Sequence, residues 1–320
     1  MNHRVAILGG SGFIGRYIVK RLAERGDVVA VGGRYAAQAK FLKLKGDVGQ
    51  VGLINIGIDD ERLLPAFLAG NDTVINCVGI LRESGRQRFD LVHHTAPARL
   101  ARLAREAGAA RFIHVSAIGA DPRSTSAYAR SKAAGEQAVR DAFPTATILR
   151  PAIVFGPEDQ FFNRFAALAS FAPMLPLIGG KTRFQPVYVG DAAQAVVAGL
   201  SGRATEGMVY ELGGPAVYTF RELLKKVCDW TQHPRPLLPI PFWAAKVTAF
   251  FTQFLPGAPI TLDQVRLLQR DNIVSAAAIR DQRTLSGLGI GEPRSIEVIV
   301  PPYLQRYRPR GEFSSDRISV

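Results

Sequence analysis

Cysteine and long apolar runs are both scarce in this sequence, and each scarcity excludes a class of protein. Only two cysteines, Cys77 and Cys228, occur in 320 residues, and they are too far apart in sequence to form a metal-ligand spacing. This favours a reducing compartment without excluding one disulfide. No segment reaches the roughly 18 uninterrupted apolar residues of a membrane span, so we expect none. We also expect no signal or transit peptide before the first apolar run at residues 4–8.

Acidic residues are also few, with 27 Asp and Glu against 40 Lys and Arg, and the formal net charge is +13. Arginine is concentrated in two stretches of the chain. These arginines are Arg82, Arg86, Arg88, Arg99, Arg102, Arg105, Arg111, Arg306, Arg308 and Arg310. Such a field attracts phosphates, anionic lipid surfaces or acidic protein partners, and a solvated basic face is the equally weighted alternative. Nucleic acid is not favoured as a partner, because no recognition motif with interleaved aromatics accompanies the charge.

The first forty residues carry the sharpest functional signal, an apolar run followed by closely spaced glycines and a helical pattern. This order predicts a strand, a phosphate-binding turn and a helix whose N-terminus faces the phosphates. Gly9 permits the tight turn, Gly12 lets the backbone approach a pyrophosphate, and Gly15 allows close packing of helix on strand. The predicted dinucleotide contacts in this turn are Gly9, Ser11, Gly12, Phe13, Ile14 and Gly15. The fold class that follows is α/β, a doubly wound parallel Rossmann sheet with a smaller C-terminal α/β region for substrate or partner.

The second apolar run, residues 28–31, leads into Arg34 without the acidic residue that would bind the ribose hydroxyls of NAD(H). A guanidinium suits the 2′-phosphate of NADP(H) through paired charge-assisted hydrogen bonds. Arg16 and Lys40 are candidates to assist it. NADP(H) is therefore the preferred cofactor and NAD(H) the alternative. It is also possible to explain Arg34 as an ordinary surface arginine at a strand end, without a role in cofactor binding.

Two further strands, predicted over 53–58 and 73–79, extend the cofactor site. Asp59 follows the first of them, where it can meet the adenine amino group, and Cys77, Val78 and Gly79 end the second beside the cofactor. Cys77 is expected to pack rather than act as a redox centre.

No metal site is predicted. His93 and His94 are adjacent in a helix predicted over 90–107, so they cannot share one face of it.

The candidate catalytic residues follow a strand predicted over 111–117, which contains Ser116. Tyr128 and Lys132 are four residues apart and share one helix face. The ammonium can lower the pKa of the phenol and hold the nicotinamide ribose, while the tyrosine passes a proton to a carbonyl.

These motifs together resemble the extended short-chain dehydrogenase/reductase superfamily, through residues 9–15, Ser116, Tyr128-x-x-x-Lys132 and residues 149–157. The chain is more closely similar to the atypical branch that contains the Rossmann-type accessory subunit of respiratory complex I (alpha-subcomplex subunit nine) and its bacterial relatives. The stretches that carry this closer resemblance are residues 76–81, 115–120, 156–165, 184–191 and 263–268. The likeness extends from Val5 to about Tyr307.

The resemblance implies a tightly held NADPH and, in complex I, a structural role near the quinone-reducing arm without established turnover. Yeast relatives are linked to ubiquinone synthesis, so complex I subunits or a quinone are the implied partners. The resemblance also places Pro151 and Ile153 beside the cofactor. Ala117 departs from the superfamily, because a catalytic Ser or Thr is usual there, and Ser116 would have to substitute for it. An accessory subunit and an active NADP-dependent oxidoreductase or epimerase using Tyr128 and Lys132 therefore both remain open.

The predicted domains are a dinucleotide-binding domain at 1–155 with 184–215, a smaller substrate or partner domain at 156–183 with 216–307, and a basic tail at 308–320. Asp191 is expected to cap a helix, and Thr219 to cap another with Glu222 as a capping box. The aromatic segment 237–255 is expected to be buried in the small domain, with docking on a partner or a membrane interface as the alternative. A cytoplasmic location is expected, including a peripheral one on the inner face of a bacterial inner membrane.

Overall fold

The computed structural model describes residues 3–200, 205–252 and 260–309, which gather into two compact units. The first unit contains the described residues up to Ala152, together with Val189–Gly213 and Val274–Glu292. The second contains Ile153–Tyr188, Gly214–Ile273 and the described residues from Pro293 onward. Each unit is therefore assembled from segments that are far apart in the sequence.

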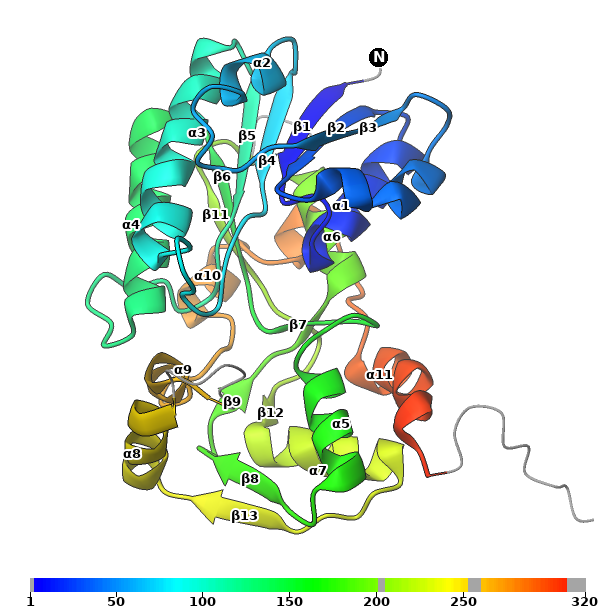
Figure 1. The fold of residues 1–320 in the computed structure, drawn as a ribbon, viewed down its shortest axis with the longest axis vertical. Coiled ribbons are helices and arrows are strands. Elements are labelled where there is room, and N and C mark those ends of the chain that lie inside the picture. Colours follow the sequence, from blue (N-terminus) through cyan, green and yellow to red (C-terminus); the bar gives the residue numbers. More distant parts are fainter. Residues whose placement is uncertain (1–2, 201–204, 253–259, 310–320) are drawn as a thin grey trace, which may run out of the picture. The chain divides into compact units, whose positions relative to one another are not determined.

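The first unit is built on a seven-stranded parallel sheet, which confirms the predicted doubly wound α/β fold (Figure 1). The strand order is β11-β6-β5-β4-β1-β2-β3, so the direction of winding reverses between β1 and β4. Open sheets of this kind bind ligands at the carboxyl ends of the strands beside that reversal. The strands are β1 (Arg4–Leu8), β2 (Val28–Gly33), β3 (Val51–Asn55), β4 (Thr73–Asn76), β5 (Arg111–Val115), β6 (Thr147–Pro151) and β11 (Val209–Leu212).

Helices cover both faces of this sheet (Figure 1). Residues Val5 to Leu8 of β1 are all fully buried, because side chains on both faces of a central parallel strand meet a helix layer. Ala6 and Leu8 share a core with residues of the second helix layer. The first layer contains α1 (Phe13–Glu24) and α6 (Val189–Ala198), and the second contains α2 (Leu64–Leu68), α3 (Ala96–Glu106) and α4 (Ala127–Ala142). Shorter helices of this unit are η1 (Ala36–Gln38), η2 (Lys40–Lys45), α10 (Ala276–Arg280) and η5 (Ser286–Leu288).

The helix predicted over 90–107 is present, but it is not α-helical throughout. It begins as a π-helical turn, η3 (Asp90–Thr95), and becomes α-helical only in α3. Pro97 supplies the physical reason, because it has no N–H to donate to the carbonyl of His93 four residues earlier. That carbonyl faces Gly135 of α4, where a Cβ atom would overlap it.

Other boundaries also differ from the prediction. The strands β3, β4 and β5 end at Asn55, Asn76 and Val115 rather than at residues 58, 79 and 117. Helix α6 begins at Val189, so Asp191 lies inside its first turn instead of capping it.

The second unit contains three two-stranded sheets, two main apolar clusters and a third, smaller group of Ala169, Leu175 and Cys228. The sheets pair β7 (Val154–Phe155) with β10 (Val187–Tyr188), β8 (Leu175–Ile178) with β13 (Leu237–Ile240), and β9 (Arg183–Phe184) with β12 (Tyr218–Thr219). The larger cluster is enclosed by α5 (Phe162–Phe171), α7 (Phe220–Thr231) and α11 (Ile296–Leu304), which η6 (Gln305–Tyr307) follows. The smaller cluster lies between α8 (Phe242–Thr252) and α9 (Leu262–Leu267). The predicted capping box is confirmed, since Thr219 and Glu222 bond reciprocally at the start of α7.

Two further sequence predictions concern the basic C-terminal tail and membrane spans. Most of the predicted basic tail, from residue 310 onward, lies outside the described residues. Within residues 3–200, 205–252 and 260–309, no helix is long and apolar enough to cross a membrane.

Candidate functional site

The glycine-rich turn joins β1 to α1 with a geometry that requires glycine. Gly9 has a φ of +80°, in the left-handed region that side chains disfavour. A Cβ atom on Gly15 would overlap the carbonyl oxygen of Gly9, and one on Gly9 would lie 3.0 Å from the carbonyl carbon of Cys77. The Gly12 amide donates to the Gly9 carbonyl at 3.0 Å and closes the turn. Glycine at these positions therefore lets strand, turn and helix pack in direct contact.

The N-terminus of α1 offers an anion site above this turn. Gly12 is the N-cap and has no side-chain hydrogen bond to the helix, and the first turn contains no acidic residue. Phe13 and Ile14, the first two helical residues, are half-buried beside Ser11, while Gly12 is exposed. The first-turn N–H groups and the positive end of the helix dipole can therefore meet a phosphate. The cradle fits the pyrophosphate of a dinucleotide.

The end of β2 lies against the same turn. A Cβ atom on Gly33 would lie 3.2 Å from Ser11 Oγ, so Arg34, the next residue, follows directly beside the turn. Arg34 is exposed, with its guanidinium carbon 6.0 Å from the centre of the Tyr35 ring.

The two cations predicted to assist Arg34 lie in α1 and η2. The guanidinium carbon of Arg16 lies 5.2 Å from the ring centre of Phe41, which is the neighbour of Lys40 in η2. Helix α1 and η2 therefore meet at Arg16 and Phe41, and a shared role of Arg16 and Lys40 beside Arg34 stays a prediction.

The two acidic residues after β3, Asp59 and Asp60, differ in their surroundings. Asp60 caps its own turn, with Oδ1 accepting from the Leu63 amide at 3.1 Å. Asp59 is exposed, and no local turn requires its carboxylate among the hydrogen bonds found. Of the pair, Asp59 is the more exposed residue, and its contact with the adenine stays a prediction.

The segment after β4 connects the glycine turn to α4. The Cys77 amide donates to the Leu8 carbonyl at 2.9 Å, and the Val78 amide donates to Asn76 Oδ1 at 3.0 Å. A Cβ atom on Gly79 would lie 3.7 Å from Lys132 Nζ. Burial raises the pKa of the Cys77 thiol to about 12, so the thiol stays protonated and is a poor nucleophile.

Tyr128 and Lys132 occupy consecutive turns of α4, which begins at the N-cap Ser126. Lys132 is 4% exposed, and its Nζ donates to the Val115 carbonyl at 3.1 Å at the end of β5. Burial lowers the pKa of Lys132 to about 8, against the opposing charge of Glu136. The lysine is therefore held between the end of the sheet and the helix, one turn from the Tyr128 phenol.

His93 belongs to this cluster, although no pattern in the sequence predicts it there. Its Nε2 accepts from the Ile80 amide at 3.0 Å, so Nδ1 carries the proton and donates to Ser131 Oγ at 2.9 Å. Its ring meets the Tyr128 ring edge-on, with centroids 5.3 Å apart. Burial lowers the pKa of His93 to about 3, and nearby Lys132 adds to this effect, so the imidazole is neutral. The π-helical turn that holds His93 has no simple sequence signal, but such turns are frequent at functional sites.

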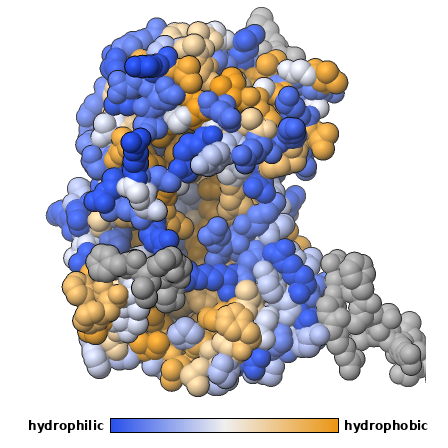
Figure 2. Space-filling view, viewed as in Figure 1, coloured by the Kyte–Doolittle hydropathy of each residue, from blue (hydrophilic) through white to orange (hydrophobic). Residues whose placement is uncertain are grey.

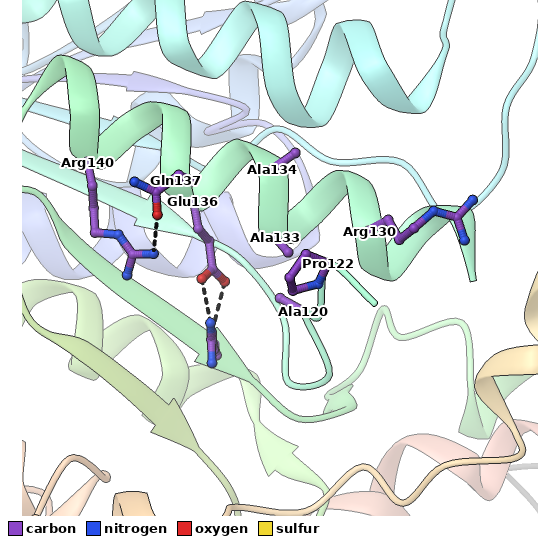
Figure 3. Close-up of a pocket in the computed structure, with 9 residues that line it drawn as sticks. Ala120, Pro122, Arg130, Ala133, Ala134, Glu136, Gln137 and Arg140 are labelled. Carbon is purple, nitrogen blue, oxygen red and sulfur yellow. Dashed lines mark hydrogen bonds and ion pairs between the residues drawn. The ribbon is translucent and has the colours of Figure 1, made fainter. Parts of the chain in front are cut away.

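The buried carboxylate of Glu136 accepts a hydrogen bond from the Ser116 hydroxyl. Ser116 Oγ donates to Glu136 Oε1 at 2.5 Å, and both residues are at most 5% exposed. Glu136 also accepts from Arg150 Nε at 2.9 Å and from its terminal nitrogen at 2.6 Å (Figure 3). The proton of the Ser116 hydroxyl is thus committed to Glu136, and Ala117 has no hydroxyl to offer. The sequence does carry one signal for Glu136, which lies one helical turn beyond Lys132.

A pocket of about 500 Å³ lies beside Glu136, between α4 and Arg150 of β6 (Figure 3). It is lined by Ala120, Pro122, Arg130, Ala133, Ala134, Glu136, Gln137, Arg140 and Arg150. Neither Tyr128 nor Lys132 is among the lining residues, so this pocket is distinct from the predicted nicotinamide end of the site.

The last two predicted cofactor contacts fall in different units. Pro151 ends β6 in the first unit, where its carbonyl accepts from the Ile118 amide at 2.9 Å. Ile153 belongs to the second unit, and its amide donates to Asn272 Oδ1 at 2.7 Å. The first unit thus contains every other predicted site residue, and the contact of Ile153 with the cofactor stays a prediction.

Residues 5–213, which include the glycine turn, Ser116, Tyr128 and Lys132, match the NAD dependent epimerase/dehydratase family. The chain belongs to this family. This membership supports binding of a nicotinamide dinucleotide, and the cradle at the start of α1 stays the predicted place for its pyrophosphate.

Individual relatives place the chain more closely. It is 39% identical over 289 residues to "NADH dehydrogenase [ubiquinone] 1 alpha subcomplex subunit 9, mitochondrial" of Arabidopsis thaliana, covering 86% of this chain and 72% of that protein. It is 36% identical over 194 residues to "Ceramide reductase" of Caulobacter vibrioides, covering 61% of this chain and 60% of that protein. The predicted resemblance to the alpha-subcomplex subunit nine branch is confirmed.

Among solved structures, the dTDP-glucose 4,6-dehydratase DesIV of Streptomyces venezuelae, with NAD and TYD bound, superposes with a TM-score of 0.71. The alignment covers 96% of this chain and 98% of that one at 22% identity. At that identity the likeness shows the fold alone.

Proposed function

We propose that this chain is an NADP(H)-binding accessory subunit of respiratory complex I, or a protein of a ubiquinone-related process, in which the cofactor stabilises the fold. The observation that carries the proposal is the hydrogen bond from Ser116 to buried Glu136. With that proton committed and Ala117 next in sequence, the end of β5 lacks a hydroxyl donor for a substrate oxygen. A ligand present at a thousand times its Kd adds about 4 kcal/mol to stability, so a cofactor can serve the fold without turning over. The relationship to subunit 9 of Arabidopsis supports the same role.

The residues proposed to hold the cofactor follow the predicted order along the first unit. The glycine turn and α1 hold the pyrophosphate, Asp59 meets the adenine, and Arg34 meets a 2′-phosphate. The segment after β4, together with Tyr128 and Lys132, borders the nicotinamide and its ribose. The full set is Gly9, Ser11, Gly12, Phe13, Ile14, Gly15, Arg34, Asp59, Cys77, Val78, Gly79, Ser116, Tyr128, Lys132, Pro151 and Ile153.

The cofactor preference is tested by exchanging the charge at Arg34. Arg34→Glu should weaken NADPH binding about tenfold or more, because it removes a charged hydrogen bond to the 2′-phosphate, and should change NADH binding little. Arg123→Glu is the matched control, since Arg123 is another exposed arginine of the same unit. Equal loss of both nucleotides in Arg34→Glu would show that Arg34 does not read the 2′-phosphate.

The structural role is tested on the protein as purified. The nucleotide released on denaturation is identified by mass spectrometry, and the native complex is then challenged with quinones and carbonyl compounds. A stoichiometric NADPH that survives purification and resists oxidation is the expected result. Loosely bound nucleotide that is consumed would overturn the accessory role.

An active NADP-dependent oxidoreductase or epimerase is the second candidate. It is favoured by the buried Lys132, whose pKa is lowered to about 8 one helical turn from Tyr128, and by the similarity to the Caulobacter reductase. A bound nicotinamide would supply hydride chemistry, and Tyr128 would exchange a proton with the substrate oxygen. In that case Tyr128→Phe abolishes turnover while cofactor affinity changes little. Turnover that survives this substitution would exclude Tyr128 as the proton donor.

We further propose that residues 1–155 with 184–215 form the cofactor domain and that 156–183 with 216–307 meet the substrate or partner. Complex I subunits or a quinone are the proposed partners, and the proposed location is peripheral, at a membrane surface.

A further inference from the structure

Helix α8 presents a row of bulky apolar side chains to solvent. The exposed fractions are 71% for Trp243, 53% for Val247, 54% for Phe250 and 72% for Phe251. Their spacing of four, three and one residues places them along one face of the helix. Figure 2 shows apolar residues gathered over α8. The expectation that this aromatic segment is buried is therefore wrong for these four side chains, and its residues 253–255 lie outside the described residues.

The opposite face of α8 explains why these side chains are not part of the core. Ala245 and Ala249 are buried, and they pack with Ile178 and with Val265 of α9 in the smaller apolar cluster. Small alanines fill the contact between the helices and satisfy it. The exposed row, which we call the aromatic stripe (Trp243, Val247, Phe250 and Phe251), is thus not required by the packing of the second unit, and a larger apolar surface of this kind marks an interaction site.

The charges around the stripe identify the chemistry of its partner. Helix α8 contains no acidic residue, and Lys246 is its single charged residue. Helix α8 packs on α9, which carries Asp263 and Arg266, and Arg270 and Asp271 follow α9 in the sequence. Aromatic rings beside cations match a bilayer interface, where the rings enter the acyl boundary and the cations meet anionic headgroups. Lys246 can extend its ammonium to the headgroups while its stem stays with the apolar side chains.

We propose that α8 is an interfacial helix, by which the second unit attaches to the surface of an anionic lipid bilayer. An 11-residue helix is too short to span a bilayer, so the helix would lie in the plane of the interface. The aromatic stripe would enter the acyl boundary, with Lys246 of the same helix at the level of the lipid phosphates. This inference deepens the peripheral location of the proposed function, and it is tested without reference to the cofactor.

Tryptophan fluorescence gives the first test, because the chain contains only Trp230 and Trp243. Trp230→Phe leaves Trp243 as the single reporter. Its emission should shift to the blue on addition of phosphatidylcholine–phosphatidylglycerol vesicles, and brominated phosphatidylcholine in those vesicles should quench it. Emission that does not respond to vesicles overturns the proposal. So does emission that is already blue-shifted and shielded from acrylamide before vesicles are added, since the protein itself would then cover the stripe.

Sedimentation with vesicles gives the second test. Phe250→Ser combined with Phe251→Ser should reduce binding to phosphatidylcholine–phosphatidylglycerol vesicles at least about tenfold, because two large apolar side chains leave the acyl boundary. The control combines Leu44→Ser with Val298→Ser, which removes two exposed apolar side chains at 84% and 67% exposure from other elements. Equal binding of both variants overturns the proposal.

Analytical ultracentrifugation distinguishes a bilayer from a second copy of this chain as the partner of the aromatic stripe. If the unmodified chain is a dimer that the Phe250→Ser, Phe251→Ser variant dissociates, the stripe binds a second copy and the bilayer proposal is wrong. Binding that is equal for vesicles of phosphatidylcholine alone would overturn the requirement for anionic lipid. Nucleotide content is measured on the same samples. Lost vesicle binding with unchanged NADPH content separates a failure of this attachment from a failure of the proposed cofactor role.

Discussion

Substitution of Glu136 tests the buried hydrogen-bonded group at the centre of the first unit. Glu136 is 1% exposed and accepts from both Ser116 and Arg150, while the Arg150 side chain is 23% exposed. Glu136→Gln keeps the volume but removes the charge that compensates the guanidinium. Breaking a buried ion pair costs about 3–5 kcal/mol, and the partial exposure of Arg150 places this substitution near the lower end, at about 3 kcal/mol.

Differential scanning calorimetry of the nucleotide-free protein measures this loss. For a chain of this size, each kcal/mol lowers Tm by about 2 °C, so Glu136→Gln should lower it by about 6 °C. Glu106→Gln is the matched control. Glu106 also pairs with an arginine, at 2.8 Å from Arg102, but both side chains of that pair are more than half exposed. Exposed pairs contribute about 0–1 kcal/mol, so the control should change Tm by no more than about 2 °C.

The change of Tm in Glu136→Gln is compared with the change in Glu106→Gln. If Glu136→Gln lowers Tm no more than Glu106→Gln does, the Ser116–Glu136–Arg150 group does not stabilise the unit. The argument that Ser116 is committed to a structural bond would then lose its basis. A rise of Tm on adding NADPH that is smaller in Glu136→Gln than in the unmodified protein would instead place Glu136 in cofactor binding.

Three other substitutions test the cradle and the π-helical turn. Gly15→Ala should abolish dinucleotide binding, measured by calorimetric titration, because its Cβ atom would overlap the Gly9 carbonyl; retained affinity would show that the turn can relax. Gly135→Ala should lower Tm by several degrees, since its Cβ atom would overlap the His93 carbonyl, whereas Gly108→Ala, with open space around it, should lower Tm only through its left-handed φ. Stability should fall as pH falls from 6.5 toward about 3, because the unfolded chain binds a proton at His93 that the folded chain, with its pKa lowered to about 3, refuses. His93→Gln should flatten this dependence of Tm on pH, and an unchanged slope would exclude His93 as its source.

The Rossmann core was predictable because its signals are local. The turn after β1 reads directly from glycine spacing, and the buried strands read from short apolar runs. The capping box at Thr219 is equally local, because its two partners are three residues apart. Tyr128 and Lys132 were likewise predicted from local signals, namely their spacing on one helix face after the strand that contains Ser116 and the glycine-rich turn.

The remaining features of the site depend on contacts that spacing does not encode. The π-helical turn follows from the missing N–H of Pro97 combined with the close approach of α4 at Gly135. Glu136 meets Arg150 across fourteen residues of sequence, from a helix to a strand. The exposure of Phe251 was not predictable either, since an aromatic run has the same sequence whether a core or a solvent faces it. Burial depends on which face of a helix packs against its neighbours, and in α8 that face carries Ala245 and Ala249.

The interrupted order of the first unit has a consequence for synthesis on the ribosome. Strand β6 pairs with β11, yet the whole of Ile153–Tyr188 emerges between them, and Val274–Glu292 completes the unit later still. During this interval β6 presents an unpaired edge, which is the kind of surface on which nascent chains aggregate. The nucleotide cradle, by contrast, emerges well before β6. A nascent chain could therefore meet its cofactor well before its sheet is closed, and a fragment that stops at Ala152 would keep the cradle but expose the edge.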